Sequence, residues 1–268
     1  MLKPDGDVKT KLLMVIGEGS IFLILLIAGV YKIRSSFKKE INLAKQQNNF
    51  LLSITHELKS PLASIKLQIE TLLKRDLDEA SKGNLFSKIL IDANRLNELV
   101  DNVLLASRIN DESFVMERQD QNIVPMLADI VEKFAKSNEG NHAISFSSEP
   151  KEIVMAIDVM AFPGIVTNLI ENSMKYSDKG SGIDVELKQD GNKITLLVKD
   201  EGDGINDENK DKVFEKFFRV DDELRRKTKG TGLGLYIVNY LVTKHNGTIE
   251  IKDNSPKGSV FEIIFYKK

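Results

Sequence analysis

Apolar residues are unevenly distributed along the chain, and their first concentration is a run of about 20 residues at positions 12–31. A helix of about 20 apolar residues is long enough to cross a lipid bilayer. The run contains one charge, Glu18, and four basic residues follow it closely: Lys32, Arg34, Lys38 and Lys39. Because basic residues concentrate on the cytoplasmic side of membrane helices, the pattern predicts a single span whose C-terminal side is cytoplasmic.

Two other structures could produce the same run, a cleaved signal peptide and the buried helix of a globular core. No small-residue cleavage pattern follows the run, and basic residues stand there instead. We therefore predict a short extracytoplasmic tail at 1–11, a transmembrane helix at 12–31 and a juxtamembrane helix at 32–48. A tail of this length is too short to fold, so we expect no folded sensor outside the membrane within these residues.

Between residues 49 and 110 the apolar positions recur every three or four residues, which predicts two amphipathic helices. The first helix presents the seam Leu51, Ile54, Leu58, Leu62, Ile65, Ile69 and Leu72, and the second presents Phe86, Ile89, Ala93, Leu96, Val100 and Val103. A polar stretch at 76–84 separates them. A helical hairpin buries too little apolar surface by itself, so we expect two copies of the chain to pair into a four-helix bundle.

From residue 111 to residue 268 the pattern changes to short elements of both kinds. Alternation with a period of two predicts strands at 183–187, 194–198, 248–252 and 260–266, paired as two hairpins. Helical spacing predicts helices at 121–134, 162–176 and 233–245. Strand hairpins with interspersed helices are typical of a two-layer α+β sandwich. The fold prediction is a multi-domain chain in which a membrane helix and a dimeric helical hairpin precede this α+β domain.

Composition excludes several classes of protein. The formal charge of −2, from 38 basic and 40 acidic residues, argues against binding nucleic acid through bulk charge. Apolar residues at 41% and charged residues at 29% exclude a disordered or multi-span membrane protein. The absence of cysteine excludes disulfides, thiolate zinc sites and cysteine nucleophiles. Of the three histidines, His142 is expected in a loop and His245, which precedes Asn246 and Gly247, at a capped helix end.

His56 lies on the first helix of the predicted hairpin, on the side away from the seam. At about 100° per residue it falls roughly 160° from the centre of the seam, so it should face solvent. A lone exposed histidine is most often a solvated surface residue. Its neighbours change that interpretation, because Glu57 places a carboxylate beside the imidazole and Ser60 a hydroxyl one turn later. Pro61 then removes one helical hydrogen bond, which makes the local geometry unusual.

Two motifs in the C-terminal part suggest a ligand pocket. The polar residues of the predicted helix at 162–176 share one face: Asn168, Glu171, Asn172 and Lys175. By itself this is an ordinary solvated face. Residues 200–205, Asp-Glu-Gly-Asp-Gly-Ile, follow an apolar strand, and their glycines let the backbone turn tightly and approach a flat ligand. A calcium loop is the rival interpretation, but Gly202 stands where that loop needs a side-chain oxygen.

A third motif, Gly-Thr-Gly-Leu-Gly-Leu at 230–235, opens the last predicted helix. Glycines at a helix N-terminus expose backbone N–H groups to an anion, which makes a phosphate cradle. An aromatic segment containing Phe214, Phe217, Phe218 and Arg219 precedes it. The glycine spacing differs from the dinucleotide fingerprint, and the chain contains neither a Gly-Lys-Ser/Thr phosphate loop nor the catalytic motifs of serine, threonine and tyrosine kinases.

The run His-Glu-Leu-Lys-Ser-Pro at 56–61 resembles the phosphoacceptor motif of the sensor histidine kinases of bacterial two-component systems. The resemblance implies that His56 is phosphorylated at a ring nitrogen and that Glu57 is the general base or orienting residue. A neutral imidazole has a nucleophilic lone pair near pH 7, so this chemistry is sensible. Four residues after the histidine the family usually has Thr or Asn, which positions a water for dephosphorylating the partner. Ser60 keeps the hydroxyl and is a candidate phosphatase residue.

The motifs of the C-terminal part, in this order and spacing, resemble the ATP-binding domain that histidine kinases share with gyrase-type topoisomerases and mismatch-repair ATPases. The resemblance implies that Asp200 accepts from the adenine amino group and that Asn172 ligates a Mg²⁺ ion bridging the phosphates. It also implies that Asn168 and Lys175 contact the phosphates or support the metal, and that Tyr176 packs at the nucleotide.

The same resemblance implies a mobile lid at about 207–231, with Arg219 or Lys229 near the γ-phosphate. Phe214 and Phe217 would anchor the lid, although packing in the core explains them at least as well. The other implied nucleotide-binding residues shape the adenine pocket or the phosphate turn: Gly202, Gly204, Gly230, Thr231, Gly232, Leu233 and Gly234.

Together the resemblances imply an ATP:protein-L-histidine phosphotransferase. We expect a homodimer held in the cytoplasmic (inner) membrane by one helix, with its kinase core in the cytoplasm and no direct contact with nucleic acid. It would use ATP and Mg²⁺ to phosphorylate His56 and pass the phosphoryl group to an aspartate of a response-regulator receiver domain. One alternative is a stand-alone ATPase of the same fold, which would not need His56. Another is a phosphatase or scaffold with a degenerate pocket, against which Asn172 and Asp200 count.

Overall fold

The computed structural model describes residues 5–109, 116–219 and 231–267, and everything below refers to these residues. The chain separates into two compact units, residues 1–49 and 50–268. Helix α1 (Asp5–Lys74) contributes to both, and we describe each unit by itself.

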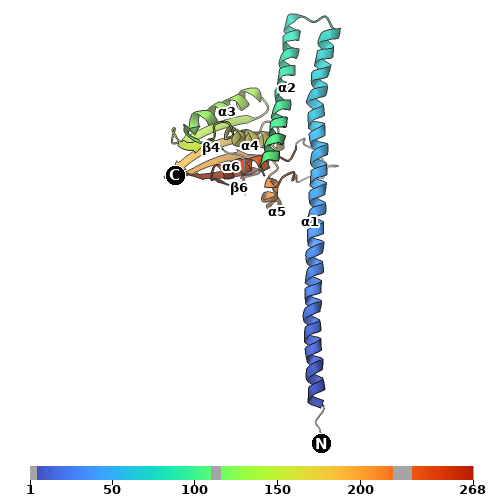
Figure 1. Ribbon diagram of the computed structural model, residues 1–268. Coiled ribbons are helices and arrows are strands. Elements are labelled where there is room, and N and C mark those ends of the chain that lie inside the picture. The colour runs from blue at the N-terminus through green and yellow to red at the C-terminus, as the bar shows by residue number, and fades with distance from the viewer. Residues whose placement is uncertain (1–4, 110–115, 220–230, 268) are drawn as a thin grey trace. The chain divides into compact units, whose positions relative to one another are not determined.

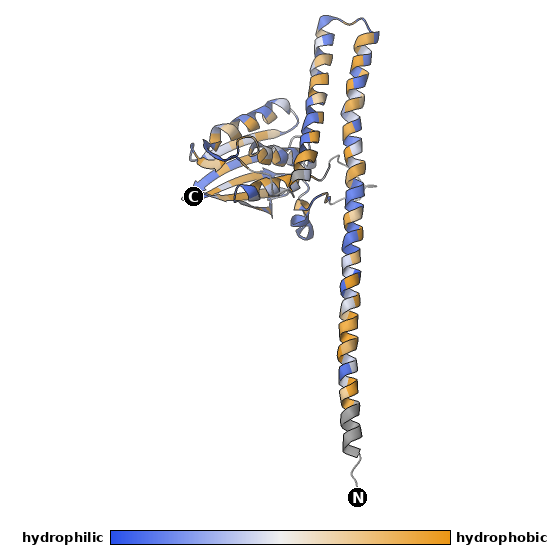
Figure 2. Ribbon diagram, in the orientation of Figure 1, coloured by the Kyte–Doolittle hydropathy of each residue, from blue (hydrophilic) through white to orange (hydrophobic). Residues whose placement is uncertain are grey.

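The first unit consists of the N-terminal part of α1. Its large apolar side chains from Leu13 onward are exposed, with Leu13 at 70% and Phe22 at 68%. Within the described residues, one helix is long and apolar enough to cross a membrane, and this stretch of α1 belongs to it. Figure 2 shows the stretch as a mainly orange band. An uncovered apolar surface of this length needs an apolar environment, which a bilayer would supply.

The second unit begins with a helical hairpin formed by the last part of α1 and by α2 (Glu79–Arg108) (Figure 1). Two polar contacts join the helices: Gln68 Nε2 donates to Asp92 Oδ2 over 3.1 Å, and Glu57 pairs with Arg95. The seam of α1 is partly uncovered in the single chain: Leu51, Leu62 and Ile69 are exposed, whereas Ile54 is buried.

The loop of this hairpin is shorter than the sequence pattern predicts. The helices end at Lys74 and begin at Glu79, so the prediction that 79–84 belong to the break was wrong. Glu79 lies in the first turn, where a carboxylate interacts favourably with the helix dipole. It also pairs with Lys82 over 2.8 Å, a contact at helical spacing. These local interactions stabilise a polar first turn that has no apolar seam.

The rest of the second unit contains two sheets. A small antiparallel pair joins β1 (Gln119–Asn122) to β3 (Val154–Ile157). The main sheet has the order β2-β4-β5-β7-β6 and consists of β2 (Ala143–Glu149), β4 (Gly182–Asp190), β5 (Lys193–Asp200), β6 (Thr248–Asp253) and β7 (Ser259–Tyr266). Strands β2 and β4 run parallel, and the other neighbours run antiparallel. Both predicted hairpins, β4–β5 and β6–β7, are confirmed, whereas β1, β2 and β3 were not predicted.

Three helices cover one face of the main sheet: α3 (Ile123–Ser137), α4 (Pro163–Tyr176) and α6 (Gly234–Lys244) (Figure 1). All three predicted helices are confirmed to within a few residues. Alternate strand residues such as Val185, Leu196 and Phe261 are buried beneath them. The intervening residues face the other side, where Glu186 pairs with Lys188 and Lys199. The domain is therefore the two-layer α+β sandwich that the pattern predicted.

Two short elements, α5 (Asp207–Lys210) and the 3₁₀ turn η1 (Lys212–Phe214), follow β5. Helix α4 begins with Pro163 in its first turn, where the missing N–H has no helical partner to lose. Helix α6 ends at Lys244 with His245 as its C-cap residue, and Asn246 follows in the left-handed region with φ 58°. The capped helix end predicted at His245 is confirmed.

Candidate active site

A cavity of about 1410 Å³ runs along one side of α4. Helix α4 contributes Asn168, Asn172, Lys175 and Tyr176 to it, and the end of β5 contributes Asp200. The segment that follows β5 and the start of α6 complete the lining with Asp203, Gly204, Arg219, Thr231, Gly232 and Gly234. Most of the side chains that the sequence places in one pocket are therefore brought together.

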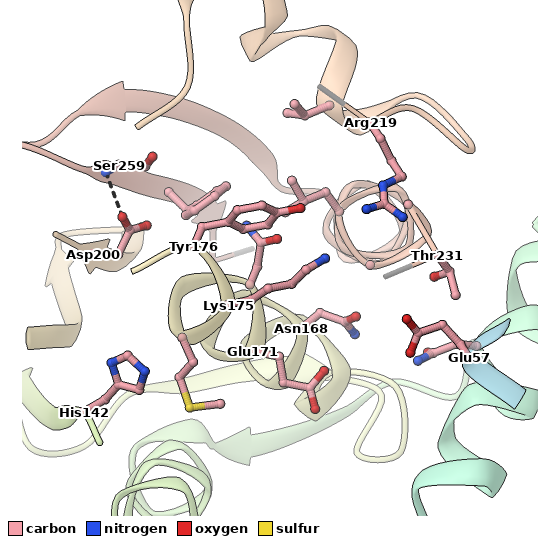
Figure 3. Close-up of a pocket in the computed structure, with 18 of the residues that line it drawn as sticks. Glu57, His142, Asn168, Glu171, Lys175, Tyr176, Asp200, Arg219, Thr231 and Ser259 are labelled. Carbon is pink, nitrogen blue, oxygen red and sulfur yellow. Dashed lines mark hydrogen bonds between the residues drawn. The ribbon is translucent and has the colours of Figure 1, made fainter. Parts of the chain in front are cut away.

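The lining of α4 follows from the two-sided pattern of this helix. Ile165, Leu169 and Ile170 are fully buried in the core, and the polar residues lie on the remaining surface. In Figure 3, Asn168, Lys175 and Tyr176 extend from α4 into one space. Lys175 Nζ lies 4.8 Å from the centre of the Tyr176 ring, so a cation and an aromatic face are adjacent there.

Asp200 is a buried acid of the cavity, with 5% of its surface exposed. Its Oδ1 accepts from the backbone N–H of Gly202 over 2.9 Å and from that of Ser259 over 3.1 Å (Figure 3). Its Oδ2 lies 3.5 Å from the hydroxyl of Ser173. Burial raises the pKa of Asp200, and these three hydrogen bonds oppose that rise.

Two glycines allow the backbone to pack tightly around Asp200. A Cβ at Gly202 would lie 2.6 Å from the carbonyl oxygen of Tyr176. A Cβ at Gly258 would lie 1.9 Å from the carbonyl oxygen of Asp200, and its φ of +115° disfavours any side chain. The side-chain amide of Asn254 donates to the same carbonyl over 2.8 Å. The turn between β6 and β7 therefore holds the end of β5 in place.

The opposite part of the cavity carries charges of both signs, because Glu57 lies there together with the cations. Arg219 and Thr231 lie on the same side in Figure 3, beyond Lys175. The hydroxyl of Thr231 accepts from the backbone N–H of Leu233 over 3.3 Å, just before α6 begins. An anion at this end would meet a guanidinium, an ammonium and a helix N-terminus.

His56 is exposed on α1, as its predicted position away from the seam requires. Glu57 is 9% exposed, and its Oε2 lies 3.5 Å from Arg95 Nη2 of α2. Neighbouring residues on a helix point about 100° apart, so the two side chains diverge. Ser60 is exposed one turn further on. Glu57 lines the cavity, whereas His56 is not among the described residues that do.

Two family models match the chain. The model described as "His Kinase A (phospho-acceptor) domain" matches residues 46–112, and the model described as "Histidine kinase-, DNA gyrase B-, and HSP90-like ATPase" matches residues 158–268. The first range contains His56 and the second contains the cavity residues of α4 and β5. The chain belongs to the sensor histidine kinases.

Individual sensor kinases agree with this assignment. The chain is 29% identical over 264 residues to the "Sensor protein CiaH" of Streptococcus pneumoniae, which covers 95% of this chain and 57% of CiaH. The chain thus spans just over half the length of this curated relative. Among solved structures, "ShkA full-length in complex with AMPPNP" gives a TM-score of 0.58 at 21% identity, covering 81% of this chain and 46% of ShkA. The complex of histidine kinase ThkA with response regulator protein TrrA gives 0.56 at 21%, covering 86% and 65%.

Some predicted residues of this sensor kinase lie elsewhere. Leu233 is 1% exposed and packs in the core, and Phe214 packs against the core, so neither lines the cavity. The Phe217 ring lies 4.3 Å from that of Phe50. Lys229 and Gly230, with residues 220–228 of the predicted lid, lie outside the described residues.

The sequence reasoning missed two residues of this kinase that touch Asp200, namely Ser173 and Ser259. Ser173 directly follows Asn172 but points to the buried side of α4, so its place in the polar motif gave no signal. Ser259 is the first residue of β7, 59 residues after Asp200, and belongs to none of the motifs.

Proposed function

We propose that this sensor kinase binds ATP in the cavity along α4 and transfers its γ-phosphoryl group to His56. The observation that carries the proposal is the distribution of charge in the cavity. A buried carboxylate, Asp200, lies at one end, and two cations, Lys175 and Arg219, lie toward the other, which Glu57 also lines. A nucleotide has the matching polarity, with hydrogen-bond donors on its base and negative charge on its phosphates.

At the base end, Asp200 would accept from the exocyclic amino group of adenine. Its Oδ1 is occupied by two backbone N–H groups, which leaves Oδ2 to face the ligand. Tyr176, at 40% exposure, offers a ring at the cavity edge against which a base could pack. Gly202 and Gly204 would keep the backbone close enough to the base for a flat ligand to fit.

At the phosphate end, Asn168, Lys175, Arg219 and Thr231 would contact the phosphates. The described residues contain no group of three or more His, Cys, Asp or Glu side chains that could hold a metal ion. Mg²⁺ keeps few protein ligands and takes oxygens from phosphates and water, so the amide oxygen of Asn172 together with ATP fits it. When bound, the ion would neutralise phosphate charge. Gly232, Gly234 and the described start of α6 would cradle the phosphates, with Gly230 and Lys229 as further candidates.

The transfer itself would use the lone pair of an unprotonated ring nitrogen of His56. That nitrogen forms a bond to the γ-phosphorus while the bond from phosphorus to the β,γ-bridging oxygen breaks, and ADP leaves with that electron pair. The other ring nitrogen keeps its proton or passes it to a base, and Glu57 is the candidate base. Since Glu57 pairs with Arg95, that role requires the carboxylate to turn from the guanidinium toward the ring.

Around this reaction we propose the usual organisation of the family. Residues 12–31 anchor the chain in the cytoplasmic membrane, with 1–11 outside and 32–48 as the juxtamembrane helix. Residues 49–110 form the dimerisation and phosphotransfer domain, and 111–268 the ATP-binding domain. The exposed residues of the α1 seam support a homodimer, and the complex of the related ThkA with TrrA supports transfer to a response-regulator aspartate. Ser60 is the proposed phosphatase residue.

Incubation of the chain with γ-labelled ATP and Mg²⁺ tests the proposal. We expect label that is stable in base and lost in acid, as expected for a phosphorus–nitrogen bond, and no label on His56→Ala. His142→Ala is the comparison variant: it removes a histidine that lines the cavity but is not the proposed acceptor, so the chain should still take up acid-labile label. ATP hydrolysis without label on the chain would instead favour the stand-alone ATPase. ATP binding with neither labelling nor hydrolysis would favour a phosphatase or scaffold.

A further inference from the structure

Ser173 is a fully enclosed hydroxyl beside the acid of the cavity. Only 1% of its surface is exposed, and it lies on α4 one residue after Asn172. Its Oγ is 3.5 Å from Asp200 Oδ2, a long hydrogen bond across the space between α4 and the end of β5. Burying a hydroxyl without a hydrogen-bond partner costs free energy. The contact with Asp200 gives the Ser173 hydroxyl such a partner.

The two oxygens of Asp200 have different surroundings. Oδ1 accepts from the backbone N–H groups of Gly202 and Ser259, so its donors are not side chains. Oδ2 has the hydroxyl of Ser173 as its side-chain donor. The orientation and charge of Oδ2 therefore depend on a side chain, that of Ser173.

We infer that Ser173 is a positioning residue that sets the preference of this pocket for adenine. The inference rests on the proposed function, because it assumes that Asp200 meets the base of ATP. An ionised Oδ2 accepts a hydrogen bond and therefore suits the 6-amino group of adenine. A protonated carboxyl would donate at the same place, and guanine presents an oxygen there instead. By donating to Oδ2, Ser173 favours its ionised form and fixes its direction.

The charge of Asp200 depends on this bond because burial works against it. Burial raises the pKa of Asp200, and the Ser173 hydroxyl is one of three donors that lower it. Without that hydroxyl the carboxyl would take up a proton at a higher pH than in the wild type. ATP binding would then fail earlier as the pH falls.

Ser173→Ala in the full chain, held in detergent, tests the inference by equilibrium nucleotide binding with Mg²⁺. Purine riboside 5′-triphosphate, which lacks the 6-amino group, is the diagnostic ligand. We expect ATP affinity to fall roughly 3- to 10-fold, as for loss of one hydrogen bond, and the analogue to bind as it does to wild type. The pH at which ATP affinity is lost on the acid side of its pH profile, the acid limb, should be higher than in the wild type. At saturating ATP the rate of His56 labelling should be unchanged, whereas KM rises.

Ser145→Ala is the matched control. The Ser145 hydroxyl donates to a carboxylate, Asp184 Oδ1, over 2.6 Å on the exposed part of β2, away from the cavity. It should leave the affinity for both nucleotides unchanged. Should Ser173→Ala fail to fold, as circular dichroism would show, Ser173→Cys fills the same space with a weak donor and should show the same selective loss of ATP affinity.

Equal loss of ATP and analogue affinity would overturn the inference, because it would make Ser173 a packing residue only. An unmoved acid limb, or a cysteine variant that binds ATP like wild type, would overturn it as well. A wild-type chain that binds no nucleotide would instead refute the proposed function, so the two failures are distinguishable.

Discussion

The Nε2 atom of His245 accepts a hydrogen bond from the backbone N–H of Asp158 over 3.1 Å, and this bond joins the end of α6 to the turn before α4. The other ring nitrogen lies 2.7 Å from the carbonyl of Leu241, to which it donates. The ring is 4% exposed, and the Phe162 ring packs edge-on with its centre 5.4 Å away. Both nitrogens are satisfied only while the imidazole is neutral.

This arrangement predicts a stability that depends on pH. Burial lowers the pKa of His245, and Arg118 nearby lowers it further, against a smaller opposing effect of the Leu241 carbonyl and Asp158. The unfolded chain then takes up a proton at about pH 6.5 while the folded domain does not. The free energy of unfolding should be at its plateau above that pH and fall as the pH drops below it.

Urea unfolding followed by circular dichroism between about pH 5 and pH 8 measures this dependence. His245→Gln removes the titrating group and should flatten the profile in this range, at the expense of lower stability at neutral pH. His142→Gln is the matched control and should retain the wild-type profile. The same profile in both variants would show that His245 does not carry the effect.

Gly258→Ala should abolish nucleotide binding and strongly destabilise the domain. Its Cβ would lie 1.9 Å from the Asp200 carbonyl oxygen, which is backbone and cannot move aside. We expect a loss above about 3 kcal/mol in the free energy of unfolding. Gly180→Ala has a φ of +91° with open space around it, so it isolates the conformational cost, about 1–2 kcal/mol. Similar losses in the two variants would contradict the clash.

Phe162→Ala should cost about 3–5 kcal/mol in the free energy of unfolding, because it leaves a cavity in the core. The side chain is fully buried, and its ring centre lies 5.8 Å from that of Phe265. Met160→Ala, two residues earlier at 91% exposure, should change stability by less than about 0.5 kcal/mol. Comparable effects at both positions would place Phe162 outside the core.

Leu62→Glu should convert the homodimer to monomer. Leu62 is 58% exposed in the single chain and belongs to the apolar seam of α1, so a charge there would be buried in the four-helix bundle. Ala63→Glu introduces the same charge on an exposed position nearly opposite the seam and should leave the dimer intact. Analytical ultracentrifugation in detergent measures both. A Leu62→Glu variant that stays dimeric would show that the seam is not the interface.

Periodicity alone located most of the helices and both antiparallel hairpins, because a repeating burial pattern is a local property. It missed β1 and β3, which are only four residues long, and β2, whose parallel partner β4 is more than 30 residues away in the chain. It also placed the start of α2 too late, since Glu79 and Lys82 stabilise a turn without apolar residues. Short strands and polar turns leave little periodic signal.

Residue types and their order along the chain were enough to predict His56 on an exposed helix face and a pocket containing Asp200 and the polar face of α4. Only the tertiary structure decided which groups touch Asp200. Ser173 precedes Asp200 in the sequence and Ser259 follows it. Both contact its carboxylate because α4 packs on the sheet and β7 lies beside β5. It likewise decided that Glu57 pairs with Arg95 of the next helix. Contacts between distant residues depend on how the elements pack, and a local pattern carries no information about them.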